Sequence, residues 1–457
     1  MRCEREIVKR MDKTDIYNQL PIFAQNAACF AEGMKIMHRR YGTYFQKKLA
    51  EYESHNAWSY EQMCEYRDRK LQRIIKHCYN TVPHYKKIFC TYGISPTEIK
   101  RMEDLRKLPI LTKKEVQQNV TDFISRAVRN TRIKIHPTGG TTGAGLRFHT
   151  SEQEEAEQWA VWWRYRRLHG IDRETLCANF GGKRTVPIKQ DKAPFWRYDL
   201  PGRQIFYSGY HITTDTVEQY ADSLKKNNIH WIHGYPSNIA LLAAYLNEKG
   251  IQIPMKWVSI GSENLLVSQK QQIEEVFCCK PIQHYGLTEG VANISEFPDG
   301  RLVVDEDFAC VELIPDKEND FCHIIGSTLT NYIMPLIRYD TGDLAAADEQ
   351  LGNRGRIVRM LQGRESDYIE TPDGRKVGAA ALSLVLCKFE EIIAAQIVQE
   401  SREQIQVNII AAEPERFRKE RLLNEFRKIY GGGVILSMVM ELEKTESGKQ
   451  KLIIAKR

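Results

Sequence analysis

The sequence lacks the features that mark membrane-spanning, secreted and disulfide-rich proteins. No apolar run approaches the roughly eighteen residues that a transmembrane helix needs. The first residues, Met1-Arg-Cys-Glu-Arg-Glu6, have no apolar signal-peptide core. The eleven cysteines are irregularly spaced and form no C-x-x-C pair, which indicates reduced thiols. We therefore expect a cytoplasmic protein without a transmembrane segment.

The sequence also lacks a dense basic run, although its net charge is +7. Because lysines and arginines are spread along the whole chain, we expect no nucleic-acid partner and a surface that tolerates anionic ligands. No internal repeat or low-complexity tract is visible. With 457 residues, 42% of them hydrophobic and 27% charged, the chain is long enough for two or three globular domains.

The chain is organised around a Gly/Thr-rich stretch, His136-Pro-Thr-Gly-Gly-Thr-Thr-Gly-Ala-Gly145. Its glycines free the backbone to turn N–H groups inward and its threonines add hydroxyls, a combination that suits the oxygens of a nucleotide phosphate. A surface loop between two strands is the alternative. A Walker A loop is excluded, because Leu146 stands where that motif requires lysine. Other parts of a nucleotide site must come from elsewhere in the chain.

Residues 1 to about 80 show helical spacing of apolar residues, and the sequence Ser59-Tyr-Glu-Gln62 predicts a helix start by a capping box. The sequence Ser151-Glu-Gln-Glu154 predicts a second such start, before a helix that carries Trp159, Trp162 and Trp163. This aromatic stripe is typical of a core. The sharper hypothesis is that Trp163 forms a wall of an organic-acid pocket.

From residue 215 the sequence alternates between helical and strand patterns, which predicts a parallel sheet with covering helices. The predicted elements are a helix 215–227, a strand 229–233, a helix 237–248, a strand 256–260, a helix opened by a capping box at Ser268-Gln-Lys-Gln271, and a strand ending at Tyr285. Ligands of such sheets lie at the carboxyl ends of the strands. Those ends are Gly234-Tyr-Pro-Ser237, Gly261-Ser-Glu263 and Gly286-Leu-Thr-Glu289, so we expect these turns to gather at one edge.

From about residue 300 the pattern becomes β-rich, and Tyr368–Val377 predicts a hairpin through its Pro-Asp-Gly turn. The last ninety residues or so resemble a small α+β domain. We therefore predict an α/β protein with two parts. Residues 1–363 form a large multi-layer domain with mostly parallel sheets and covering helices, and residues 364–457 form a small α+β C-terminal lid.

Five ordered motifs resemble the adenylate-forming enzyme superfamily, and within it the phenylacetate–CoA ligase branch and its capsular-polysaccharide-biosynthesis relatives. The motifs are Thr138–Gly143, Tyr285-Gly-Leu-Thr-Glu289, Pro335–Asp343, Gly363–Asp367 and Ser447-Gly-Lys449. The resemblance runs from about residue 71 to the C-terminus. It implies an ATP-dependent acid–thiol ligase that forms an acyl-AMP and transfers the acyl group to coenzyme A.

The resemblance also implies site residues and cofactors, namely ATP, Mg²⁺ and coenzyme A. It places Thr288 on the α-phosphate, Glu289 on Mg²⁺, which prefers oxygen ligands, and Lys449 between the attacking carboxylate and the α-phosphate. The residues that it implies for the pyrophosphate oxygens are Thr138, Gly139, Gly140, Thr141, Thr142 and Gly143. For the nucleoside, the resemblance implies a base pocket lined by Gly261, Ser262 and Glu263, with Tyr285 and Gly286 at the adenine and Asp343 at the ribose. It also includes Arg364 among the cofactor-binding residues.

In the second half-reaction, the resemblance implies a rotation of the small domain that carries Lys449 away, with Glu365, Ser366 and Asp367 in the hinge region. Two alternatives remain open: an adenylyltransferase that leaves AMP on its acceptor, and a non-catalytic nucleotide-binding component of envelope or capsule assembly. Some relatives carry a Cys/His metal site after the Thr-Glu motif. Residues 290–301 hold no Cys or His, so we predict no structural zinc.

The acid itself cannot be read from the sequence. The residues that we predict for its pocket are Trp163, Phe180, Gly181, His233 and Tyr235. The expected partners are a small-molecule carboxylic acid and coenzyme A or another thiol, and a homodimer is an open expectation.

Overall fold

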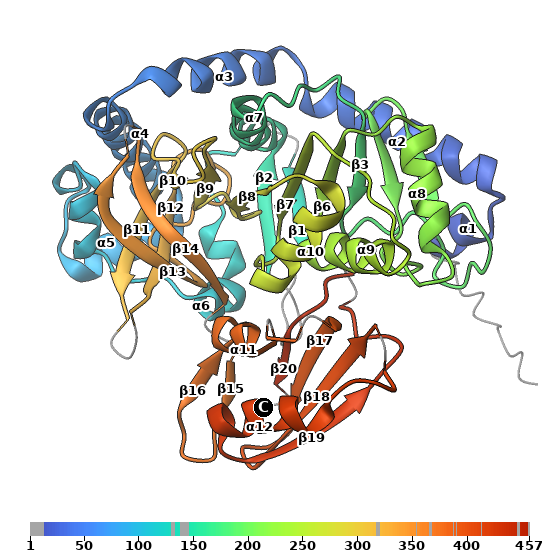
Figure 1. Cartoon of the computed structure of the whole chain (residues 1–457). Helices are drawn as coiled ribbons and strands as arrows, with labels where there is room; N and C mark the ends of the chain where they lie inside the picture. The colour runs from blue at the N-terminus through green and yellow to red at the C-terminus, as the bar shows by residue number, and fades with distance from the viewer. Residues whose placement is uncertain are drawn as a thin grey trace, which may run out of the picture.

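The computed structural model describes residues 13–128, 133–137, 146–316, 320–352, 354–364, 368–386, 388–389, 391–412, 414–445 and 448–455. Figure 1 shows a large upper part, with helices above and below a long sheet, and a smaller C-terminal part beneath it. None of the helices in these ranges is long and apolar enough to cross a membrane. The predicted α/β class with a small C-terminal α+β part is confirmed.

The N-terminal part is helical, as its spacing predicts. Its elements are α1 (Lys13–Gln19), α2 (Ile22–Arg40), α3 (Thr43–Ser54), α4 (Tyr60–Thr81), α5 (Pro83–Tyr92) and α6 (Lys113–Gln118). The predicted capping box at the start of α4 is confirmed, since the Gln62 N–H donates to Ser59 Oγ at 3.3 Å and the Ser59 N–H donates to Gln62 Oε1 at 2.9 Å. The apolar face of α4 packs into a buried cluster with α5 and the loops that follow it.

A 12-stranded sheet forms the centre of the large part, in the order β11-β12-β13-β14-β10-β9-β8-β7-β6-β3-β5-β4. Its strands are β3 (Cys177–Phe180), β4 (Trp196–Asp199), β5 (Gln204–Tyr207), β6 (Trp231–Gly234), β7 (Trp257–Gly261), β8 (Pro281–Gly286), β9 (Asn293–Glu296), β10 (Leu302–Val304), β11 (Ala309–Pro315), β12 (Cys322–Thr328), β13 (Tyr339–Leu351) and β14 (Arg356–Arg364). The neighbours β5, β3, β6, β7 and β8 pair in parallel. The strands from β9 to β14 pair antiparallel.

Helices cover both faces of the parallel strands (Figure 1). The helices α8 (Val217–Lys226), α9 (Pro236–Glu248) and α10 (Val267–Phe277) bury one face. The other face is buried by α3 and by α7 (Glu152–Leu168), which follows the antiparallel pair β1 (Ile133–Pro137) and β2 (Arg147–Ser151). The predicted capping box at Ser151 and Glu154 opens α7, with hydrogen bonds of 3.1 and 2.6 Å.

The prediction of a capping box at Ser268 is wrong. α10 begins at Val267, so Ser268 lies inside its first turn. The side chain that closes the start of the helix is Gln269, whose Oε1 accepts the Leu266 N–H at 3.1 Å. The Ser-x-x-Gln spacing is therefore present in the sequence, but Gln269, two residues before Gln271, caps the helix instead.

The C-terminal part has its own sheet and core. The hairpin of β15 (Tyr368–Glu370) and β16 (Lys376–Gly378) is confirmed, and α11 (Ala379–Leu386) follows it. The four-stranded sheet has the order β19-β18-β17-β20, formed by β17 (Ile392–Gln399), β18 (Gln404–Ala411), β19 (Gly433–Met438) and β20 (Ile453–Ala455), with α12 (Lys419–Tyr430) packed on it. Ile393, Ile410 and Leu442 join the core around α9 instead, so the small part is docked on the large one.

Candidate active site

Three strand ends of the parallel sheet meet at one edge, as the alternation of strands and helices predicts. β6, β7 and β8 are adjacent and parallel, with Gly234 opposite Ile260 and Gly261 opposite His284. Glycine is required at 234, because a Cβ atom there would lie 2.5 Å from the carbonyl carbon of Phe180 on β3. The turns that follow the three strands therefore form one continuous edge.

The C-terminal part places Lys449 against this edge. Lys449 Nζ donates to the Ser262 carbonyl at 2.9 Å and lies 5.5 Å from the centre of the Tyr235 ring. These contacts join a residue near the end of the chain to two different strand ends. Lys449 and Ser262, nearly two hundred residues apart in sequence, therefore meet where the motifs predict a reaction centre.

Glu263 ties the C-terminal part to the same edge. Its two carboxylate oxygens accept the Ser237 N–H at the start of α9 and the Gln450 N–H, each at 3.2 Å. Burial raises the pKa of Glu263 to about 6, although the hydrogen bonds from Ser237 and the positive charge of Lys449 act in the opposite direction. The carboxylate is therefore ionised at neutral pH.

Tyr285 and Asp343 contact each other, although four strand spacings separate β8 from β13 in the sheet order. The Tyr285 hydroxyl donates to Asp343 Oδ2 at 2.8 Å. Four spacings of about 4.8 Å would keep the two strands roughly 19 Å apart in a flat sheet, so the sheet is strongly curved here. The Thr341 hydroxyl accepts the Asp343 N–H at 3.1 Å and holds the turn. This arrangement presents a fixed carboxylate beside an aromatic ring.

Thr288 and Glu289 follow β8 with different exposures. Thr288 is exposed, whereas the Glu289 side chain is 8% exposed. The donor set of a buried carboxylate next to an accessible hydroxyl suits Mg²⁺, which takes one or two carboxylates together with phosphate oxygens and water. The described residues contain no cluster of three or more His, Cys, Asp or Glu that could hold a metal on its own. The residues present therefore fit a metal that arrives with a nucleotide.

Several predicted residues lie outside the part of the chain that the structure describes. They are Thr138, Gly139, Gly140, Thr141, Thr142, Gly143, Glu365, Ser366 and Asp367. The strands that border the Gly/Thr loop are described, and Pro137 lies opposite Arg147. The backbone of Arg364 pairs with Asp343 in the β13–β14 ladder, so these two predicted site residues are neighbours.

The predicted acid-pocket residues lie in different places. Trp163 and Phe180 are buried in separate hydrophobic cores, around α7 and around α8 and α9 respectively. The His233 ring bonds to Ser259, and burial, with the nearby Arg166, lowers its pKa to about 3, so it is neutral. The burial of Trp163 and Phe180 in these two cores does not support a role for either side chain as a wall of the acid pocket. Gly181 and Tyr235, in contrast, lie on the lid side, where the Tyr235 ring meets Lys449.

Sequence reasoning missed two polar side chains at this edge. Lys444 Nζ donates to the Gly209 carbonyl, and burial lowers its pKa to about 8. Asn238 is 2% exposed in the first turn of α9. A signal existed for each: Lys444 precedes Lys449 by five residues in the same loop, and Asn238 directly follows the turn after β6.

Away from this sheet edge, a cavity of about 450 Å³ lies between α3, α4, the start of α7 and the loop after β12. It contains none of the predicted site residues. Its charged lining residues are Lys48, Glu51, Lys70, Arg73, Glu154 and Glu157. Size alone therefore does not locate the predicted site.

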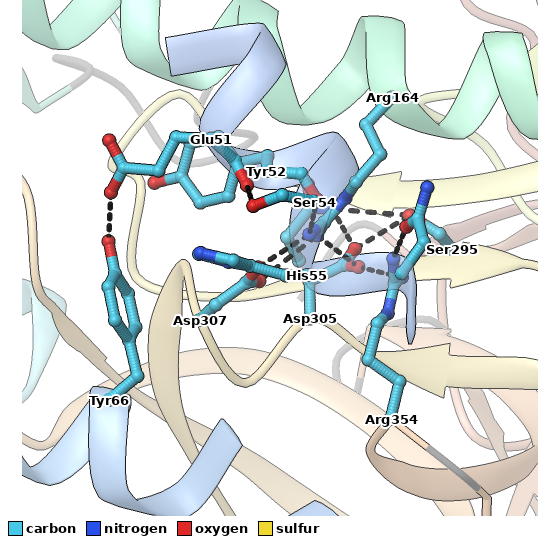
Figure 2. A network of polar contacts seen from close by, with 12 residues as sticks. Glu51, Tyr52, Ser54, His55, Tyr66, Arg164, Ser295, Asp305, Asp307 and Arg354 are labelled. Carbon is cyan, nitrogen blue, oxygen red and sulfur yellow. Dashed lines mark hydrogen bonds and ion pairs between the residues drawn. The ribbon is translucent and has the colours of Figure 1, made fainter. Parts of the chain in front are cut away.

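A network of buried charges supports the sheet behind the site (Figure 2). Arg164 on α7 donates to Asp305 at 2.8 Å and to Asp307 at 3.0 Å, and Arg354 donates to Asp305 at 2.7 Å. The His55 ring bonds to Asp307 at 2.8 Å. Burial alone would raise the pKa of Asp307, but Arg164 and His55 hold it well below its usual value. These side chains join α7 to the turn that follows α3 and to the loops that precede β11 and β14.

Asn293 continues this network to the site strand. Its amide Nδ2 donates to Asp305, and its Oδ1 accepts the Trp162 indole N–H at 3.0 Å and bonds to the His284 ring at 2.9 Å. Burial lowers the pKa of His284 to about 4. Because His284 precedes Tyr285 on β8, the network fixes the strand that carries the predicted adenine contact.

The fold is that of the adenylate-forming ligases. A crystal structure of 2-hydroxyisobutyryl-CoA ligase in the postadenylation state, in complex with 2-HIB-AMP, superposes with a TM-score of 0.64 at 17% identity, covering 86% of this chain and 89% of that one. The same enzyme in the thioesterification state, with 2-HIB-AMP and CoA, gives a TM-score of 0.51 at 16% identity, covering 86% and 90%. The predicted superfamily fold is therefore confirmed.

Relatives by sequence include CapK and phenylacetate–CoA ligases. Residues 369–456 match the family model described as the CapK C-terminal domain. Protein CapK of Staphylococcus aureus is 24% identical over 450 residues, which are 96% of this chain and 98% of that protein. The phenylacetate-coenzyme A ligase of Escherichia coli is 24% identical over 339 residues, which are 71% of this chain and 76% of that enzyme. The predicted resemblance to phenylacetate–CoA ligases and to CapK is thus confirmed.

Proposed function

We propose that the chain is an ATP-dependent acid–thiol ligase. In the first half-reaction a carboxylate oxygen attacks the α-phosphorus of ATP, and the bond to pyrophosphate breaks. In the second half-reaction a thiol, coenzyme A in this proposal, attacks the acyl-AMP carbonyl and releases AMP. The observation that carries the proposal is the position of Lys449, whose Nζ reaches Ser262 and Tyr235 at the edge where three strand ends meet.

The reaction needs positive charge between two anions, because the carboxylate and the phosphates repel each other. Lys449 supplies it at the predicted position, and a preorganised cation is worth more in a site that excludes water. The Asp343 carboxylate would accept hydrogen bonds from the ribose hydroxyls, and the Tyr285 hydroxyl, which donates to it, would hold it in position. Thr288 would donate to the α-phosphate, and Glu289 would hold Mg²⁺, which neutralises phosphate charge when it is bound.

We further propose that residues 364–457 act as a lid that rotates between the half-reactions. The higher similarity to the postadenylation state of 2-hydroxyisobutyryl-CoA ligase than to its thioesterification state supports an adenylation-type arrangement here. Gly363, with φ of +85°, lies two residues before the proposed hinge, and a Cβ atom there would meet the Asn264 side chain. Limited proteolysis should cut near residues 363–376, at a rate that nucleotide alters.

The test is acid-dependent pyrophosphate release from ATP and Mg²⁺, measured against a panel of carboxylic acids. We expect at least one acid to stimulate release, and free AMP to accumulate once coenzyme A is added. Retention of AMP on the product would indicate an adenylyltransferase instead. Calorimetry that detects no ATP or AMP binding, with Mg²⁺ and the acids present, would overturn the assignment.

A further inference from the structure

Asn238 is a buried amide whose carbonyl oxygen has no partner. The residue lies in the first turn of α9, directly after β6, and is 2% exposed. Its Nδ2 donates to the Phe180 carbonyl at 3.1 Å. This bond sets the orientation of the amide, because the Phe180 oxygen can only accept. In the part of the chain that the structure describes, Asn238 Oδ1 receives no hydrogen bond.

The amide lines a narrow cavity between the large part and the lid. The cavity is bordered by the loop 181–186, by Tyr207 to Tyr210, and by Gly448, the residue before Lys449. Gly209 makes room for the amide, since a Cβ atom at that position would lie 2.5 Å from Asn238 Nδ2. The amide is therefore clamped on the border of this cavity, whose wall also contains the residue before Lys449.

A buried acceptor without a partner is unfavourable unless an ordered water or a ligand satisfies it. Buried amide oxygens are nearly always hydrogen-bonded in folded proteins. A group that fits here must carry an N–H or O–H donor. A purely apolar chain or ring would leave Asn238 Oδ1 unsatisfied in the closed complex, and would be selected against for that reason.

The charges around the cavity decide between the two kinds of donor. Lys183 and Arg184 line it, and Lys444 donates to the carbonyl of Gly209 on its border. Glu263, the carboxylate that interacts with Lys444, already accepts two backbone N–H groups. Positive surroundings oppose an ammonium group and leave a neutral hydroxyl as the matching donor.

We propose that Asn238 selects the substrate, and that the acid is a small hydroxy acid rather than an unsubstituted aliphatic or aromatic one. This inference rests on the proposed function. The carboxylate of the acid would lie at Lys449, and its hydroxyl would donate to Asn238 Oδ1 one or a few bonds away. The hydroxyl takes no part in bond breaking; it orients the acid for attack.

The experiment compares acids of one carbon skeleton: butanoate, its 2-, 3- and 4-hydroxy derivatives and 3-aminobutanoate, with phenylacetate as the aromatic probe. The readout is kcat/KM for pyrophosphate release by the full chain. We expect one hydroxy acid to exceed butanoate, 3-aminobutanoate and phenylacetate by at least about tenfold, the effect of one buried hydrogen bond.

Asn238→Leu should abolish that preference, so that kcat/KM for the preferred hydroxy acid no longer exceeds that for butanoate. Because leucine could clash with Gly209, Asn238→Ala serves as a second variant that removes the acceptor without adding bulk. Asn247→Leu, on the exposed last turn of the same helix, is the matched control and should keep the preference. Thermal unfolding confirms that each variant is folded.

Two results would overturn the inference while leaving the ligase intact: wild-type protein that uses butanoate or phenylacetate as well as every hydroxy acid, or an unchanged hydroxyl preference in both Asn238 variants. If no acid releases pyrophosphate although ATP binds, the proposed function fails, and the role of Asn238 in substrate choice fails with it.

Discussion

Two groups of charged side chains differ in how they are partnered. Behind the site, Arg164 and Arg354 bond to the carboxylates of Asp305 and Asp307, so charge is matched by charge within one rigid set. At the lid, Lys444 donates to a backbone carbonyl and Glu263 accepts from backbone N–H groups. The first group is held by partners of opposite charge, whereas the second is hydrogen-bonded to neutral backbone groups.

The difference separates structure from function within one molecule. A network of matched charges in a dry interior is costly to break, since removing one partner leaves the other buried and uncompensated. Charges held by neutral backbone groups can exchange those contacts for a ligand or for solvent at lower cost. We therefore expect mutations in the first group to act on stability, and mutations in the second to act on catalysis and lid docking.

The largest effect is expected from Arg164→Ala. The Arg164 side chain is 1% exposed and bonds to two aspartates, and its removal leaves both carboxylates buried next to fewer positive charges. We expect a loss of about 3–5 kcal/mol of unfolding free energy, measured by urea denaturation. An unfolding midpoint equal to that of wild type would show that the network is not a structural anchor.

The next effect is on catalysis, from Lys449→Ala. Loss of one preorganised cation typically costs about 3 kcal/mol or more, roughly a hundredfold to a thousandfold in rate. Acid-dependent pyrophosphate release should fall by that factor, while thiol transfer from supplied acyl-AMP stays nearly intact. Lys428→Ala, on the exposed face of α12, is the control within the lid. Equal loss of both half-reactions in a folded variant would contradict the proposed role.

Glu263 should make stability depend on pH. Its folded pKa of about 6 lies above the usual glutamate value of 4.5, so its contribution to stability is fully present below about pH 4.5 and is lost as pH rises through 6. Glu263→Gln removes this titration. The unfolding free energy of the variant minus that of wild type should therefore increase from pH 4.5 to pH 7, by an amount on the order of 2 kcal/mol.

Neighbouring groups keep their charge over this range, because the pKa of Lys444 is about 8, that of Tyr235 about 12 and that of His233 about 3. The remaining charge that faces Glu263 is Lys449. Glu275→Gln, at an exposed position on α10, is the control. A difference between Glu263→Gln and wild type that does not change with pH would remove Glu263 as a titrating link between lid and core.

The strand-end turns could be predicted from the sequence because their signals are local. Gly234, Gly261 and Gly286 each follow a short apolar strand, and the parallel pairing of those strands brings the turns together. The Tyr285 and Asp343 motifs were equally visible. Their contact was not, since it depends on the curvature of a sheet whose intervening strands are not consecutive in sequence.

The acid pocket could not be predicted because helical spacing says which residues share a face, but not what that face meets. Trp163 and Arg164 are neighbours on α7, yet Trp163 packs near Trp231 and Arg164 is buried by aspartates about 140 residues away in sequence. Asn238 became a candidate only when its Oδ1 was seen to lack a partner. Such long-range satisfaction of polar groups leaves no local signal.

The smallest effect is expected from Arg167→Ala, which lies three residues after Arg164 on the same helix. Arg167 donates to Glu53 at 3.0 Å, but its side chain is 39% exposed and that of Glu53 is 32% exposed. Water screens such a pair and side-chain entropy opposes it, so we expect a change within about 0.5 kcal/mol in the same urea experiment. Two arginines one helical turn apart would then differ by several kcal/mol because of burial and partner geometry alone. If Arg167→Ala proved as destabilising as Arg164→Ala, general helix or charge effects of α7 would explain both losses, and the distinction between matched buried charges and the other charges would fail.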